Sequence, residues 1–78
     1  MKEIYIGTVV WFNNRDGFGF IAWNHNQIAQ KDMFVHFSDI EMDGFRSLKK
    51  DQQVAFSIGT NHQGDPKAIH VQIIEATG

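Results

Sequence analysis

Five short runs of β-branched and aromatic residues divide the 78-residue chain, and clusters of Gly, Asn and Asp separate them. Short apolar runs between close turns are typical of β-strands, whereas no stretch of ten or more residues repeats its apolar residues at the helical period. The sequence therefore predicts an all-β fold with strands over 4–12, 18–23, 33–37, 53–58 and 67–74. We expect these five strands to close into a small antiparallel barrel, because closure removes exposed strand edges.

The length leaves room for one domain, residues 1–78, with a thin core, because a chain this short buries only about 60% of its unfolded surface. The absence of cysteine excludes disulfides and thiolate zinc sites, and it fits a reducing compartment. No apolar run is long enough for a signal peptide after Lys2 or for a membrane span. We therefore expect a cytoplasmic monomer without membrane association.

The aromatic residues are concentrated in the first 45 positions. Strand side chains alternate between faces, so Phe18 and Phe20 point to one side of their strand and Ile21 to the other. In the next run, Phe34 and His36 likewise share one face. If the two strands pair, these four side chains form one flat patch, and the glycines beside the two phenylalanines leave the ring faces uncovered.

Each of these rings taken alone could belong to the core, since Phe is usually buried. Other side chains already suffice to fill a small barrel: Ile21, Met33, Val35, Val54, Phe56, Ile58, Val71 and Ile73. Rings left over on the opposite face form an exposed apolar patch, and such patches usually mark binding sites. A flat aromatic patch with one histidine suits unstacked bases, each of which offers a π-face.

Strand alternation predicts the burial of Trp23 but not that of Trp11. Trp11 has the same parity as Val9, which we expect to be buried, and only a strong twist or a bulge near the strand end would expose Trp11. Alternation therefore leaves Trp11 open. Trp23 has the parity of Ile21, which favours packing in the core or at its rim over a role as a further stacking ring.

The formal net charge of −2 argues against a partner held mainly through its phosphates, because such proteins usually carry a basic face. A nucleic-acid ligand would depend on the aromatic residues instead. Arg46, Lys49 and Lys50 form a basic trio that either contacts phosphate or is ordinary solvated charge. The sequence leaves both interpretations of the trio open.

Metal binding and catalysis find little support in the sequence. Three histidines have neither cysteine nor carboxylate at ligand spacing: His25, His62 and His70. Asp39, Glu41 and Asp43 lie in a polar connection and are interpreted as a solvated edge rather than as paired catalytic carboxylates. We therefore expect no enzyme activity, no metal, no cofactor and no small-molecule substrate.

The same segments closely resemble the bacterial cold-shock proteins and the cold-shock domain of Y-box proteins. The first-strand sequence GTVVWFN at 7–13 is similar to that of the family. DGFGFI at 16–21 resembles its first RNA-binding motif and MFVHF at 33–37 its second. DGFRSL at 43–48 resembles the loop that follows, and QVAF at 53–56 resembles the fourth strand. Both motifs in this order are a highly specific signal, and the likeness covers roughly 6–74.

This resemblance implies a five-stranded barrel of the oligonucleotide-binding (OB) type and a nucleic-acid surface on which Trp11 is exposed. The candidate binding residues are Trp11, Phe12, Asn13, Arg15, Phe18, Phe20, Phe34, His36, Phe37, Phe45 and Arg46. The resemblance also implies a partner, which is single-stranded RNA or DNA with a lean towards pyrimidines, and action as an RNA chaperone. No residue identifies a reader of the 2′-hydroxyl, so the sequence does not choose between RNA and DNA.

The chain departs from the family pattern in two regions. Positions where the family commonly has lysine hold Thr8, Val10 and Asp16, which depletes the phosphate-binding rim, and Arg15 restores part of it. The loop over 24–32 is longer than the usual bacterial form.

An alternative function is a protein-interaction module that docks a peptide on the same aromatic patch.

Overall fold

The computed structural model describes residues 3–44 and 46–74. The chain forms the strands β1 (Tyr5–Asn13), β2 (Phe18–His25), β3 (Ile28–Ala29), β4 (Met33–His36), β5 (Gln53–Thr60) and β6 (Pro66–Ile73), with a 3₁₀ turn η1 (Phe37–Asp39) after β4. These elements confirm the all-β prediction with its five main strands. In the described part of the chain, no helix is long and apolar enough to cross a membrane.

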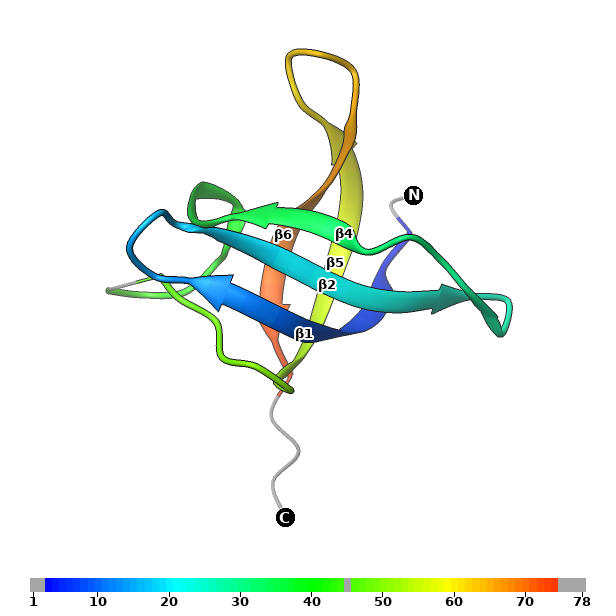
Figure 1. The fold of residues 1–78 in the computed structure, drawn as a ribbon, viewed down its shortest axis with the longest axis horizontal. Coiled ribbons are helices and arrows are strands. Elements are labelled where there is room, and N and C mark those ends of the chain that lie inside the picture. The colour runs from blue at the N-terminus through cyan, green and yellow to red at the C-terminus, as the bar shows by residue number, and fades with distance from the viewer. Residues whose placement is uncertain (1–2, 45, 75–78) are drawn as a thin grey trace.

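The strands form one strongly curved antiparallel sheet in the order β3-β2-β1-β5-β6, and β4 also pairs with β2. In Figure 1, β1, β2 and β4 run across the view, while β5 and β6 cross them steeply. The segment after η1 joins β4 to β6, because Ile40 forms a parallel bridge with Val71. The N–H of Glu41 donates to the carbonyl of Val71 at 2.7 Å. This bridge brings the two ends of the sheet together into the predicted OB-type barrel.

The predicted loop over 24–32 is partly a hairpin, so the chain has one strand more than expected. β2 continues to His25. The chain then reverses direction at Asn26 and Gln27, which have φ values of 52° and 66°, and β3 pairs antiparallel with β2. Two successive positive φ values are those of a tight type I′ turn, which usually contains glycine. The hairpin was missed because Asn26-Gln27 lacks that signal.

Ten apolar side chains form the buried core: Val9, Ile21, Met33, Val35, Ile40, Leu48, Val54, Phe56, Ala68 and Val71. The prediction that Ile58 is buried was wrong, since 37% of that residue is exposed. The pairing of β5 with β6 shifts between Ala55 and Ser57, and Ser57 is buried directly after Phe56. This bulge reverses the alternation and turns Ile58 outward. Ile73 is half-buried and packs against the core.

A second bulge, in β1, decides the position of Trp11. Val9 pairs with Ile21 and Trp11 pairs with Phe20, so Val10 is an extra residue between them. The extra residue rotates the end of β1 and places Trp11 on the outer face, 42% exposed, although Val9 is buried. The exposure of Trp11 implied by the family resemblance is confirmed.

β1 and β2 approach closely beside Trp11. A Cβ atom added to Gly19 would lie 2.7 Å from the Cα of Phe12, which is closer than side chains are found. Glycine at this position therefore allows the contact between the two strands that sets the outer rings side by side.

Candidate nucleic-acid interface

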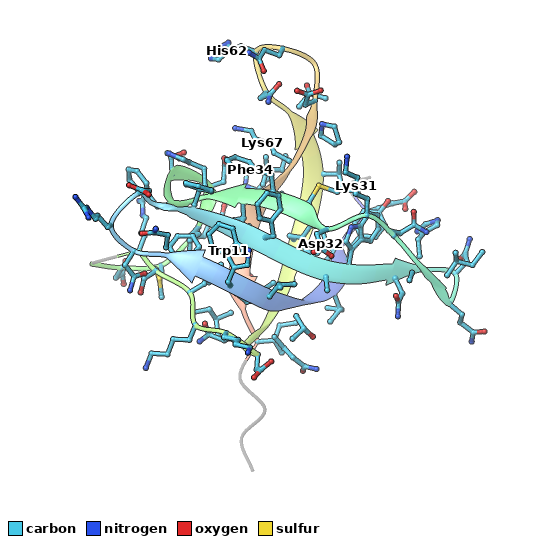
Figure 2. All side chains as sticks on the ribbon, viewed as in Figure 1. Trp11, Lys31, Asp32, Phe34, His62 and Lys67 are labelled. Atoms are coloured by element: carbon cyan, nitrogen blue, oxygen red, sulfur yellow. The ribbon has the colours of Figure 1, made fainter. Side chains whose placement is uncertain are left out.

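Five aromatic side chains point outward from three neighbouring strands: Trp11 on β1, Phe18 and Phe20 on β2, and Phe34 and His36 on β4. We call them the aromatic strip. Phe18 pairs with His36 and Phe20 with Phe34, which is the shared face that alternation predicted. Figure 2 shows Trp11 on one side of β2 and Phe34 on the other. The strip thus crosses the width of three strands.

The rings of the strip touch one another. The ring centroids of Trp11 lie 5.5 Å from those of both Phe18 and Phe20. Phe34 lies 5.8 Å from the same two phenylalanines, edge-on to Phe20 and nearly parallel to Phe18. Tilted and offset arrangements at these separations are the favourable ones for aromatic pairs. Because these four rings hold each other in place, a flat ligand meets an organised surface.

His36 ends the strip, and its contacts with Ser38 favour one tautomer of the neutral ring. The backbone N–H of Ser38 donates to Nδ1 of His36 at 3.3 Å, and the Ser38 hydroxyl oxygen lies 2.8 Å from the same atom. Since Nδ1 accepts, the hydrogen of the neutral ring is on Nε2. A neutral His36 therefore offers an N–H donor from the side of the ring turned away from the backbone.

Phe37 was predicted to continue the third strand, but it begins η1 instead. Its ring lies 4.6 Å from that of His36, and 43% of the residue is exposed. Its N–H donates to the carbonyl of Gly17 at 2.8 Å. A Cβ atom on Gly17, which has φ of 77°, would lie 2.6 Å from the Phe37 ring. Phe37 thus extends the aromatic surface beyond the end of β4, over the turn between β1 and β2.

A groove of about 420 Å³ follows Phe37 at this end of the strip. Its other lining residues are Asn14, Arg15, Asp16, Gly17, Gly44 and Arg46. Both arginines were candidate site residues, and the fold brings them to the same groove from separate loops. Two guanidinium groups beside an exposed ring form a suitable place for a phosphate that follows a stacked base.

Asn13 shapes the turn that carries Arg15. Its side-chain oxygen accepts hydrogen bonds from the N–H groups of Arg15 at 2.9 Å and Asp16 at 3.0 Å. Its side-chain nitrogen donates to a carboxylate oxygen of Asp16 at 3.2 Å. Asn13 therefore positions the loop, and its own polar atoms are already engaged.

Three further residues complete the comparison with the sequence prediction. Phe12 is half-buried and packs against the core, so it does not join the strip. Trp23 also packs against the core, as expected, and its Nε1–H donates to the carbonyl of Lys31 at 3.0 Å. Phe45 lies outside the described residues.

A second groove, of about 530 Å³, opens at the other end of the strip and was not foreseen. It lies between the strip residues Phe20 and Phe34, the segment before β4, and the start of β6. Its other lining residues are Trp23, Gln30, Lys31, Asp32, Met33, Ile58, Asp65 and Pro66. The exposed Ile58 contributes here only because of the β5 bulge, which no sequence signal marked.

Both grooves beside the strip contain carboxylates as well as cations, so the interface has no uniformly basic face. Thr8 and Val10 lie on β1 beside the strip, and the exposed Asp16 lies in the arginine groove. The ammonium group of Lys67 lies 3.0 Å from a carboxylate oxygen of Asp39, whose side chain is only 19% exposed, so the prediction that Asp39 belongs to a solvated edge was wrong. Within the described residues, no cluster of His, Asp or Glu is suited to a metal ion. Away from the strip, the pKa of Tyr5 is raised by its hydrogen bond to the Glu3 carboxylate.

The family described as the 'Cold-shock' DNA-binding domain matches residues 5–74, which includes the whole strip and both grooves. The chain belongs to the cold-shock domain family. This is a family of nucleic-acid-binding, non-enzymatic domains, and membership indicates that the chain binds nucleic acid.

Bacterial cold-shock proteins are similar over most of the chain. The cold shock protein CapB of Pseudomonas fragi is 50% identical over 74 residues, which are 95% of this chain and all of the relative. The cold shock-like protein CspD of Escherichia coli K12 is 48% identical over 68 residues, 87% of this chain and 82% of CspD. A cold shock-like protein of Thermotoga maritima is 44% identical over 69 residues, 88% of this chain and 97% of the relative.

The fold is also similar to that of a solved structure, Drosophila Unr CSD456. The two superpose with a TM-score of 0.69 at 20% sequence identity, over 99% of this chain and 29% of the other. At this identity the likeness supports the OB-type cold-shock fold.

Proposed function

We propose that this cold-shock domain binds single-stranded nucleic acid by stacking unpaired bases on the aromatic strip. The observation that carries the proposal is the outward orientation of five aromatic side chains on three neighbouring strands, four of which are in ring contact. A protein that used these rings only for its own stability would turn them inward, where the core is already complete.

The aromatic strip, rather than charge, supplies the larger part of the binding free energy. Stacking of a base on an aromatic side chain contributes about 1–3 kcal/mol per base. The net charge of −2 argues against a large phosphate contribution, because the protein as a whole does not attract an anionic strand. Arg15 and Arg46 are the candidate phosphate contacts, because both line the groove that continues the strip beyond Phe37.

Unpaired bases are favoured over duplex because a paired base does not offer its face to a ring. The Nε2–H of His36 donates to an acceptor on the base that lies beside it, and the carbonyl oxygens of thymine, uracil and cytosine are such acceptors. We expect the preference for pyrimidines to be modest, since stacking and fit discriminate weakly between bases.

A domain that binds unpaired bases with little sequence preference acts as an RNA chaperone by mass action. It binds the open form of an RNA hairpin and not the paired form, and this shifts the equilibrium towards the open form. We also propose that the domain acts in the cytoplasm as a monomer. Cell fractionation and analytical ultracentrifugation test these two points.

Tryptophan fluorescence during titration with a short oligothymidine tests the proposed function. The chain contains two tryptophans, so the matched variants Trp11→Phe and Trp23→Phe separate their signals. We expect strong saturable quenching in the wild type and in Trp23→Phe, and a much smaller change in Trp11→Phe, because Trp11 belongs to the strip whereas Trp23 lines the groove beyond its end. Duplex of the same sequence is the control ligand and should bind much more weakly.

Two results would contradict the proposal. Equal affinity for duplex would show that base faces are not used. The absence of any saturable change with oligonucleotides would favour the alternative function, in which the strip docks a peptide.

A further inference from the structure

An ion pair joins two elements beside the aromatic strip. The Nζ atom of Lys67, at the start of β6, lies 3.0 Å from Oδ2 of Asp39, the last residue of η1. The side chains are largely covered, with 25% of Lys67 and 19% of Asp39 exposed. The pair is therefore more shielded from water and salt than an ordinary surface pair.

The position of Lys67 places its cation at the edge of the strip. β6 packs against β4, which carries Phe34 and His36 (Figure 1). Ala68 is buried, so the alternation of β6 turns Lys67 to the outer face, where the strip also lies. The preceding residue, Pro66, lines the same groove as Phe34.

The Oδ2 atom of Asp39 depends on the Lys67 ammonium because no other group compensates its negative charge in the described part of the chain. That oxygen is buried and has no hydrogen-bond partner within the described residues, so the Lys67 ammonium 3.0 Å away acts on it as a counter-charge. If Lys67 moved to a phosphate, a buried carboxylate oxygen would lose its counter-charge, which is strongly unfavourable. A phosphate must therefore compete with a partner that is already in place and already desolvated.

We propose that Asp39 withholds Lys67 from the phosphates of a bound single strand. The charge of Lys67 makes it a candidate phosphate contact, but the pair with Asp39 offsets that charge. Asp39 thereby lowers both the affinity for nucleic acid and the dependence of that affinity on salt. The inference rests on the proposed function, and it assigns to Asp39 a role in setting affinity without contact with the ligand.

The substitution Asp39→Asn tests the inference, because the amide keeps the shape of the carboxylate and removes its charge. A released Lys67 adds one phosphate contact, which steepens the slope of log K against log salt by about 0.7 for a single strand. We expect the affinity for oligothymidine to rise about eightfold at 50 mM salt and about threefold at 200 mM. Asp39→Ala serves as a second variant, with the same expected increase in slope.

Two controls separate release of Lys67 from a general change of charge. Asp51→Asn removes one negative charge in the turn before β5, and we expect its salt slope to match that of the wild type. In the double variant Asp39→Asn with Lys67→Gln, the gain should disappear, since the cation that Asp39 withheld is gone. Thermal unfolding of each variant confirms that the domain is folded under the conditions of titration.

The inference is overturned if both Asp39 variants bind with the wild-type slope, or if the gain survives the removal of Lys67. It is also overturned if Asp51→Asn gives the same gain. These results concern the ion pair only, provided that the wild type binds oligothymidine. A wild type that shows no saturable binding overturns the proposed function itself, so the two failures are distinguishable.

Discussion

The described residues contain two clusters of aromatic rings, and the clusters differ in how deeply they are buried. The aromatic strip lies on the outer face of β1, β2 and β4. The second cluster, which we call the inner cluster, consists of Tyr5, Trp23 and Phe56. Its ring centroids lie 5.1 to 5.9 Å apart, and neighbouring rings of the strip lie 5.5 to 5.8 Å apart. Ring spacing therefore does not distinguish the two clusters.

Burial distinguishes them. Phe56 is part of the buried core, and Tyr5 and Trp23 pack against that core from its rim. The strip has the strands on one side and an open face on the other, with Trp11 the most exposed of its rings. The same kind of ring contact thus stabilises the fold in one cluster and prepares a binding surface in the other. Substitutions in the two clusters should separate stability from binding.

The largest effect is expected in the inner cluster. Phe56→Ala removes a buried ring and should lower the free energy of unfolding by about 3–5 kcal/mol, because it leaves a cavity in a small core. Urea denaturation followed by circular dichroism measures this loss. A Phe56→Ala protein as stable as the wild type would show that the core does not depend on the inner cluster.

In the strip, Phe20→Ala and Phe34→Ala should weaken binding more than they weaken the fold. Each removes one stacking ring, so we expect about a tenfold loss of affinity for oligothymidine in fluorescence titration. The loss of stability should be about 1–2 kcal/mol, since each ring is only half-buried and loses its contacts with neighbouring rings. If either variant lost as much stability as Phe56→Ala, the substituted ring would be part of the core and not of the binding surface.

The salt dependence of binding should be weak. With Lys67 paired to Asp39, and with Lys31 in the second groove offset by Asp32 and Asp65, we count the two arginines of the first groove as phosphate contacts. Two contacts give a slope of log K against log salt of about −1.4, or about a sevenfold loss between 50 and 200 mM. Titration at four salt concentrations measures the slope. A slope steeper than about −4 would make phosphate contacts, and not the strip, the larger contribution.

The smallest expected effect concerns the tautomer of the His36 ring. The backbone N–H of Ser38 donates to Nδ1 of His36 and favours the hydrogen of the neutral ring on Nε2, and the Ser38 hydroxyl can donate to the same atom. Imidazole ¹⁵N chemical shifts at high pH should show this tautomer in the wild type, and Ser38→Ala should reduce its population because one of the two contacts is lost. Dominance of the Nδ1–H tautomer in the wild type would remove the proposed donor to the base. His25, in the same spectrum, is the internal reference.

Alternation along the chain was sufficient to predict the common face of Phe18, Phe20, Phe34 and His36, because both of their strands are regular at that point. It failed where the backbone is irregular. The bulge at Val10 exposes Trp11, and the bulge in β5 exposes Ile58. Bulges depend on the pairing of distant strands, and neither has a local residue pattern that reveals it.

The connection between β4 and β5 shows the same limit. It was predicted as a polar loop, but Ile40 and Leu48 within it are buried core residues. Ile40 is also the residue that bridges to β6 and joins the ends of the sheet. An irregular segment has neither strand nor helix periodicity, so the sequence does not indicate which of its apolar residues will be buried.

The central claim is that bases stack on the aromatic strip and not on the inner cluster. Nuclear Overhauser effects between the thymine methyl protons of bound oligothymidine and protein ring protons test it directly. The account predicts cross-peaks to Trp11, Phe18, Phe20 and Phe34, with none to Tyr5 or Phe56. Cross-peaks confined to residues outside the strip, in a complex that is shown to be saturated, would contradict it.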